Sequence, residues 1–162
     1  MKKIIFVAGI HGCGKSTFCS NLSKSMKIPT FSCSDLIRKS KKIEFSNKLT
    51  NDISQNQNLL KIAINNYLSH INSYILDGHF SLLDSNFNIV KIPFETFANL
   101  GITKVILLNT SIDIIYNNLK KRDNVIYSKE LLTNFLHEEL SYCKYVTQKL
   151  KIPLEIIDPY NS

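Results

Sequence analysis

Residues 9–17 read Gly9-Ile10-His11-Gly12-Cys13-Gly14-Lys15-Ser16-Thr17, which matches the pattern G-x-x-x-x-G-K-[ST] at every fixed position. Glycines in such a loop let the backbone curl, so that successive amide N–H groups point at phosphate oxygens. The apolar run 4–8 precedes the loop, and a helical pattern that places Phe18, Leu22 and Met26 on one face follows it. The motif therefore stands between a strand and a helix, which is the context that phosphate binding requires.

This loop predicts a site for ATP and Mg²⁺. A helix that starts within residues 14–16 adds the positive end of its dipole to the phosphate site. Lys15 is expected to reach the β- and γ-phosphates, and the Ser16 hydroxyl is expected to ligate Mg²⁺. The residues expected to bind the nucleotide are Gly9, His11, Gly12, Cys13, Gly14, Lys15, Ser16 and Thr17.

The rest of the chain alternates short β-rich runs with longer helical patterns, which predicts a parallel α/β sheet. Strands are expected at 4–8, 30–32, 74–77, 104–108 and 154–157, and a hairpin is expected from 80–83 and 89–92. Helices are expected at 14–26, after a Ser34 cap, around 59–67, and at 94–100, 111–122 and 128–150. The polar segment 46–58 is expected to be mobile. The prediction is one domain over residues 1–162 with a P-loop NTPase fold, a five-stranded parallel sheet flanked by helices.

Asp77 ends the third expected strand, just before Gly78. Parallel α/β sheets bind ligands beyond the carboxyl ends of their strands, and an aspartate there can hold Mg²⁺ directly or through water. The alternative is a turn or capping aspartate. The metal role is favoured because the phosphate loop follows the first strand at the same edge.

Composition points to a globular protein with a solvated basic surface. The formal charge is +7 and the pI is near 9.2, but the lysines are scattered, so a nucleic-acid partner is possible in principle and not favoured. No apolar run approaches the roughly 18–20 residues of a membrane span. The apolar stretch after Lys2 and Lys3 is too short for a signal peptide, so a cytoplasmic location is expected.

Four cysteines, Cys13, Cys19, Cys33 and Cys143, have no C-x-x-C or paired Cys/His spacing, which argues against a zinc site. They are expected to be reduced thiols. Cys13 lies within the phosphate loop, so its oxidation could block the site, more as a liability than as a switch.

Two short segments resemble adenylate kinases. Ser34-Asp35-Leu36-Ile37-Arg38 looks like the segment of that family that follows strand two, and Asp77-Gly78-His79 resembles the Asp-x-His element of the archaeal-type enzymes. The order of the later elements, including the helix that ends at Arg122 and the long last helix, follows the same family. The resemblance implies the nucleotide-kinase branch of P-loop folds.

By this resemblance, Asp35 and Arg38 would bind the acceptor, within an acceptor-binding segment 34–70. Arg122 would act from a short lid near 122–128 and stabilise the transferring phosphoryl group, where such an arginine is worth about 10³- to 10⁵-fold in rate. The alternative for Arg122 is a cation that interacts with a helix C-terminus, and for Arg38 a solvated helix residue. His79 could orient the acceptor or a water, or be structural. Arg38 and Arg122 are the only arginines in the chain.

The sequence thus predicts an ATP-dependent phosphotransferase in which Lys15, Asp77 and Arg122 are catalytic and the acceptor is a nucleoside monophosphate. One alternative is a kinase for another acceptor, such as a nucleoside, a sugar or a polynucleotide end, which the scarcity of arginine favours. Another is an ATP-dependent switch or assembly factor with slow ATP hydrolysis. Fold alone does not separate these functions.

Overall fold

A computed structural model describes residues 2–44, 53–123 and 126–161 of the chain. The elements in chain order are β1 (Lys3–Ala8), α1 (Lys15–Met26), β2 (Thr30–Ser32), α2 (Cys33–Glu44), α3 (Ile53–Tyr67), β3 (Ser73–Gly78), β4 (Ser81–Leu83), β5 (Ile89–Lys91), α4 (Phe94–Leu100), β6 (Lys104–Leu108), α5 (Ile112–Asp123), α6 (Lys129–Leu150) and β7 (Leu154–Ile157). Five strands form one parallel sheet in the order β2-β3-β1-β6-β7, and β4 pairs with β5 as an antiparallel hairpin. The predicted five-stranded parallel sheet and the hairpin are confirmed.

The central strand β1 lies between β3 and β6, and alternate side chains enter two separate cores. Ile4 and Phe6 pack into the first core, and Ile5 and Val7 pack into the second. All four are buried. A strand covered on both faces needs apolar side chains at every position, which is why residues 4–8 form a continuous apolar run.

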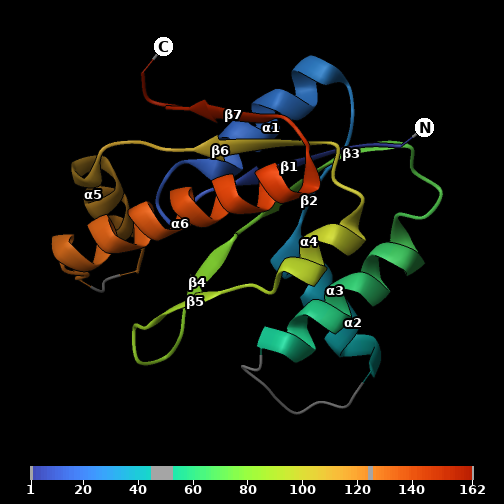
Figure 1. Cartoon of the computed structure of the whole chain (residues 1–162), viewed down its shortest axis with the longest axis horizontal. Helices are drawn as coiled ribbons and strands as arrows, with labels where there is room; N and C mark the ends of the chain where they lie inside the picture. The colour runs from blue at the N-terminus through green and yellow to red at the C-terminus, as the bar shows by residue number, and fades with distance from the viewer. Residues whose placement is uncertain (1, 45–52, 124–125, 162) are drawn as a thin grey trace.

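Helices cover both faces of the sheet (Figure 1). Residues of α2, α3, α4 and the C-terminal half of α6 pack against one face. Residues of α1, α5 and the N-terminal half of α6 pack against the other core. Figure 1 shows α6 running across the front of the sheet, with the hairpin projecting below it.

The register of the sheet brings the candidate residues to one edge. Ala8 at the end of β1 pairs with Gly78 at the end of β3, and Ser32 at the end of β2 pairs with Asp77. Because parallel strands end at the same edge, the loop that begins at Gly9 lies beside Asp77.

The start of α2 differs from the prediction. The helix begins at Cys33, directly after β2, and Ser34 lies in its first turn instead of capping it. The Ser32 hydroxyl accepts a 3.4 Å hydrogen bond from the Asp35 N–H and lies 2.9 Å from the Ser34 hydroxyl. The strand runs into the helix without a loop, so its last residue takes the capping position.

The polar segment 46–58, which was expected to be mobile, is helical in its second part. Residues 53–58 belong to α3. The remainder of the expected mobile stretch lies outside the described residues, as do residues 124–125 of the expected lid.

The long helix α6 occupies almost the whole of its predicted range, 128–150. Ser128 caps it by accepting a 3.0 Å hydrogen bond from the Leu131 N–H, and the apolar residues Leu132, Phe135, Cys143 and Val146 are buried. Glu139 is also buried. Apolar periodicity did not reveal it, because a carboxylate counts as a solvent-facing residue in such a pattern.

The α1 stripe is less buried than expected. Phe18, Leu22 and Met26 are half-buried at the margin of the second core, and the buried residue of α1 is Cys19. Helix α1 still covers β1 and β3 and so fixes the direction of the phosphate loop.

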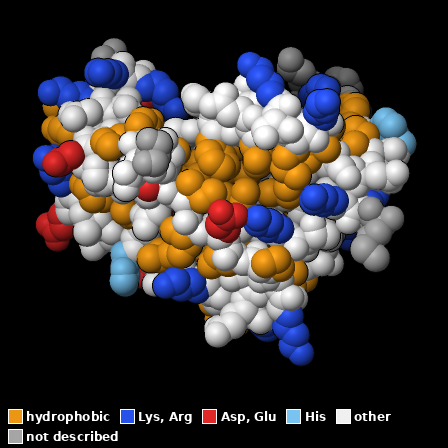
Figure 2. Space-filling model, turned by 90° about the horizontal axis from the view of Figure 1, so that it is seen from above, with side chains coloured by type: hydrophobic (Ala, Val, Ile, Leu, Met, Phe, Trp, Pro, Cys, Tyr) orange, Lys and Arg blue, Asp and Glu red, His pale blue; other side chains and the backbone are white. Residues whose placement is uncertain are grey.

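The surface on the side of the edge strand β7 carries both hydrophobic and charged side chains. Figure 2 shows hydrophobic side chains gathered at the centre of this face, with Lys and Arg side chains spread around them instead of forming one block. Ile156 of the edge strand β7 is 45% exposed. Within the described residues, no helix has the length and apolar character needed to cross a membrane.

Candidate active site

The phosphate loop joins β1 to α1 through glycines in left-handed conformations. Gly12 has φ +87° and Gly14 has φ +88°, which side chains with a Cβ rarely adopt. A Cβ on Gly12 would lie 3.1 Å from the carbonyl oxygen of Ile115, and one on Gly14 would lie 3.0 Å from the Tyr160 hydroxyl. The loop is therefore held between α5 and the segment after β7, and its glycines are required there by conformation and by space.

Lys15 stands at the centre of the site. Its Nζ donates a 3.0 Å hydrogen bond to the Gly9 carbonyl oxygen, and lies 3.5 Å from the Asp77 carboxylate. The same Nζ is 3.2 Å from Nε2 and 3.3 Å from Nδ1 of His79. The Lys15 side chain is 10% exposed, so its charge acts where water is scarce and electrostatic interactions are strong.

A polar cavity of about 400 Å³ opens above the loop. It is lined by Ile10, His11, Gly12, Gly14, Lys15, Ser16, Thr17, Ser32, Ser34, Asp77, His79, Asn118, Arg122 and Tyr160. Most of the predicted nucleotide-binding residues meet here, together with Asp77, His79 and Arg122. We refer to it as the donor cavity.

Gly9 and Cys13 are the predicted loop residues that do not line the donor cavity. The Gly9 carbonyl instead holds Lys15, and the Cys13 side chain is buried under the loop in the second core. The Cys13 thiol, whose oxidation was considered from the sequence, is therefore shielded from solvent.

The donor cavity also contains Asn118 and Tyr160, which were not selected as site residues from the sequence. Asn118 of α5 donates hydrogen bonds to the Gly12 carbonyl oxygen at 2.8 Å and to the Tyr160 hydroxyl at 3.0 Å. Tyr160 carried a weak signal, because it follows the last strand at the edge that binds ligands. Asn118 carried none, since its partners are distant in sequence.

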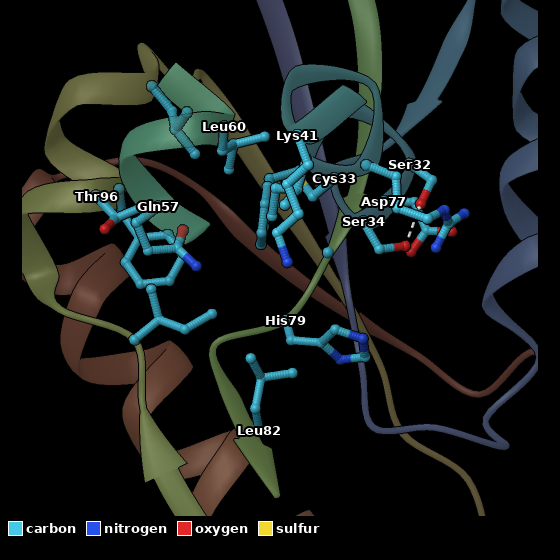
Figure 3. A pocket seen from close by; sticks show the side chains of 17 residues that line it. Ser32, Cys33, Ser34, Lys41, Gln57, Leu60, Asp77, His79, Leu82 and Thr96 are labelled. Atoms are coloured by element: carbon cyan, nitrogen blue, oxygen red, sulfur yellow. Dashed lines mark hydrogen bonds between the residues drawn. The ribbon is translucent and has the colours of Figure 1, made fainter. Parts of the chain in front are cut away.

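A second cavity, of about 260 Å³, adjoins the first (Figure 3). Its walls are mainly apolar and include Phe6, Ile37, Leu60, Leu82, Ile92, Phe97 and Leu100. Figure 3 shows Gln57, Leu60 and Thr96 at one end and Ser32, Ser34 and Asp77 at the other, with the Lys41 amine between them. After the acceptor-binding role predicted for residues 34–70, we refer to it as the acceptor cavity.

The two cavities share four lining residues, Ser32, Ser34, Asp77 and His79. A group bound on the phosphate loop and a group bound in the acceptor cavity would thus meet at these side chains. A shared boundary of this kind is what direct transfer between two bound molecules requires.

Arg38 and Asp35 form an ion pair three residues apart on α2, and both side chains are mostly exposed. Arg38 lines the acceptor cavity, whereas Asp35 lines neither of the two cavities. The structure therefore places Arg38 at the acceptor cavity and places Asp35 outside both cavities. Arg122, at the end of α5, lies 3.2 Å from Asp123 and lines the donor cavity.

The two histidines lie ring to ring, with centroids 4.6 Å apart. Desolvation by the surrounding protein, followed by the charge of Lys15, lowers the pKa of His11 to about 4, although the ring keeps contact with solvent. Burial, again followed by Lys15, lowers the pKa of His79 well below its ordinary value. Both imidazoles are therefore neutral at pH 7, and each can donate one hydrogen bond and accept another.

The residues present fit a magnesium ion. Ser16, in the first turn of α1, offers a hydroxyl, and Asp77 offers a carboxylate in the same donor cavity. Mg²⁺ prefers such hard oxygen ligands, and binds one or two carboxylates together with phosphate oxygens and water. Within the described residues no group of three or more His, Cys, Asp or Glu side chains could hold a metal by itself, so the nucleotide phosphates would supply much of the coordination.

Cys13 is expected to resist alkylation in the folded protein. Burial raises the pKa of its thiol to about 11, so at pH 8 only about one molecule in a thousand carries the reactive thiolate. We expect iodoacetamide to modify Cys13 at least about 100-fold more slowly in the folded protein than in urea at the same pH. Peptide mass spectrometry over time measures both rates. Equal rates would contradict the buried position.

Comparison with known proteins gives one family and a common fold. A family model described as an AAA domain matches residues 8–130, more than half of the chain. Among solved structures, a gluconokinase from Sinorhizobium meliloti 1021 aligns at TM-score 0.56 and 15% identity, over 99% of this chain and 84% of that one. A shikimate kinase from Bacteroides thetaiotaomicron aligns at TM-score 0.56 and 15% identity, over 99% and 89%. No curated protein matches the sequence. At these identities the structural likenesses establish a P-loop kinase fold.

Proposed function

The chain belongs to the AAA-domain family, and from that premise we propose that it is a kinase that transfers the γ-phosphoryl group of Mg-ATP to a nucleoside monophosphate. The observation that carries the proposal is the pair of adjoining cavities. One is polar and built on the phosphate loop, the other is largely apolar, and they meet at Ser32, Ser34, Asp77 and His79.

The walls of the acceptor cavity favour a nucleotide over a polyhydroxylated acceptor. Phe6 and Phe97, together with the aliphatic side chains, offer surfaces on which a flat base can pack. Gln57 and Thr96 at the far end can hydrogen-bond to the edge of a base. A sugar or sugar acid would place several hydroxyl groups against apolar walls, where unmade hydrogen bonds cost about 1–3 kcal/mol each.

Two cations of the acceptor cavity are suited to the acceptor phosphate. Arg38 and Lys41 line the cavity on the α2 side, and the Lys41 amine points into it (Figure 3). Arg38 would turn from Asp35 to the phosphate, and its planar fork matches two phosphate oxygens. This assignment agrees with the resemblance of residues 34–38 to adenylate kinases. We propose that the segment 34–70 binds the acceptor within a single kinase domain, since Arg38, Lys41 and Gln57 of this segment line the cavity.

In the proposed reaction an oxygen of the acceptor phosphate attacks the γ-phosphorus in line. The bond between the γ-phosphorus and the oxygen that bridges it to the β-phosphorus breaks, and ADP leaves with that oxygen. Lys15 would neutralise the β- and γ-phosphates, and Arg122 would stabilise charge on the transferring group. Ser16 and Asp77 would hold Mg²⁺, which when bound supplies charge neutralisation and orients the phosphates. His79, as a neutral imidazole between the cavities, would orient the acceptor oxygen.

A second candidate is a kinase for a less highly charged acceptor, such as a nucleoside or a sugar acid. The observation that favours it is the small number of cations, since Arg38 and Lys41 are the only Lys or Arg side chains in the described lining of the acceptor cavity. The two solved structures that share the fold are, by name, a gluconokinase and a shikimate kinase, and neither name denotes a nucleotide acceptor.

The deciding experiment is Mg-ATP consumption against a panel of nucleoside monophosphates, nucleosides and sugar acids, with Lys15→Ala as the blank. We expect ADP formation that depends on one nucleoside monophosphate and disappears in the blank. Turnover with a nucleoside or sugar acid alone would establish the second candidate. Slow hydrolysis that no acceptor changes would contradict both and support an ATP-dependent switch.

A further inference from the structure

Glu139 is a charged side chain in the interior that the proposed reaction does not use. It lies in the middle of α6 and is 1% exposed. Phe135 and Cys143, one turn before and after it on the same face, are buried apolar residues. An apolar residue would continue that stripe, whereas burying a carboxylate costs several kcal/mol unless its oxygens are well satisfied.

Both oxygens of Glu139 accept hydrogen bonds from residues 80–81. The Phe80 N–H donates to Oε2 at 2.9 Å, the Ser81 N–H donates to Oε1 at 2.8 Å, and the Ser81 hydroxyl donates to Oε1 at 2.6 Å. Burial raises the pKa of Glu139, and these hydrogen bonds act in the opposite direction. A carboxylate has two acceptor oxygens and so can serve three donors, which a glutamine amide cannot do in the same geometry.

The anchored segment is the point at which the chain leaves the parallel sheet. Strand β3 ends at Gly78, β4 begins at Ser81, and His79 lies between them. The Phe80 ring packs in the first core against Phe6 and Phe97. The Phe80 N–H and the Ser81 N–H point to α6, where the Glu139 carboxylate accepts a hydrogen bond from each.

We propose that Glu139 is a positioning residue that holds the β3–β4 junction against α6 and thereby fixes the His79 imidazole between the donor and acceptor cavities. This role rests on the proposed function, since His79 matters there as the residue beside the transferred group. Glu139 does not line either cavity. It would act on His79 through the backbone of Phe80, the residue that follows His79.

The chain offers a matched pair of substitutions. Glu139→Gln keeps one acceptor oxygen and presents an amide NH₂ where the other accepted. Glu138→Gln removes the same charge from the adjacent position, where the side chain is 43% exposed and lies 3.9 Å from Lys91. Ser81→Ala removes one of the three donors and leaves the carboxylate and both backbone hydrogen bonds in place.

Because a misplacement of about 1 Å can cost about 10²-fold in rate, we expect Glu139→Gln to lower kcat about 10- to 100-fold. ATP affinity should stay within about twofold, because the phosphate loop is untouched. Glu138→Gln should match the wild type, and Ser81→Ala should lower kcat about threefold, following the loss of one of three hydrogen bonds. Wild-type kcat in Glu139→Gln would overturn the proposal. If Glu139→Gln does not fold, wild-type kcat in Ser81→Ala would overturn it.

The imidazole NMR signals of His79 test the positioning without any turnover. We expect a shifted or broadened His79 signal in Glu139→Gln and in Ser81→Ala, and an unchanged signal in Glu138→Gln. If the wild type transfers no phosphoryl group, the proposed function fails but this comparison still decides the positioning. A His79 signal that is the same in all the folded variants would overturn it.

Discussion

Lys15→Ala is expected to lower kcat for phosphoryl transfer by about 10³-fold. The Lys15 side chain is 10% exposed, and its ammonium group lies within 3.5 Å of Asp77 and His79, which border the acceptor cavity. In the proposed reaction, the residue would therefore stand where the donor phosphates and the acceptor meet. Alanine would remove the ammonium charge that is expected to balance the negative charge that develops on the β- and γ-phosphates during transfer.

The matched control for this variant is Lys24→Ala, which removes an exposed lysine from the last turn of the same helix. We expect its kcat to equal that of the wild type. Circular dichroism and thermal unfolding should show that both variants fold. A Lys15→Ala enzyme with more than about a tenth of wild-type kcat would contradict the catalytic role, since a charge that balances transferring phosphate is worth far more.

The phosphate loop could be predicted from the sequence because all of its residues are consecutive in the chain. Nine consecutive residues supply the backbone curl, the lysine and the hydroxyl, and the apolar run before them makes the central strand. The order of the strands, β2-β3-β1-β6-β7, was not predicted and comes from the structure, although parallel strands joined by helices have few alternative arrangements. Asp77 was selected for another reason, because it closes an apolar strand and parallel strands end at the same edge of the sheet; the structure places it in the donor cavity.

The residues that complete the site were harder to predict because they meet only in three dimensions. Asn118 reaches Gly12, and Glu139 reaches Phe80, across long separations in sequence. Neither belongs to a motif. Asp35 shows the converse, since its motif predicted an acceptor contact while the helix places it beside Arg38, away from both cavities.

The identity of the acceptor depends on the walls of a cavity, and these come from separate elements. Ile37 is on α2, Leu60 on α3, Leu82 on β4, and Phe97 on α4. In the sequence each is one more apolar residue with helical or strand spacing. Their convergence beside the phosphate loop is visible only in the folded chain, and the proposal of a nucleotide acceptor depends on it.

Asp77→Asn is expected to lower kcat by about 10²-fold at saturating ATP, because the amide keeps the shape of the side chain and loses the charge that Mg²⁺ prefers. The rate should also need a higher Mg²⁺ concentration for half-maximal activity. Chelation of Mg²⁺ should abolish transfer in the wild type. Initial rates over a Mg²⁺ titration measure all three effects.

Asp77 also lies 3.5 Å from Lys15, so loss of its charge could act through that lysine instead of through the metal. The Mg²⁺ titration separates these causes, since a displaced lysine lowers kcat equally at every Mg²⁺ concentration, whereas a lost metal ligand shifts the midpoint. Asp113→Asn is the control, because Asp113 is exposed on α5 and paired with Lys129. A midpoint that is the same in Asp77→Asn and in this control would contradict the metal role, and would leave Asp77 as the residue that orients Lys15.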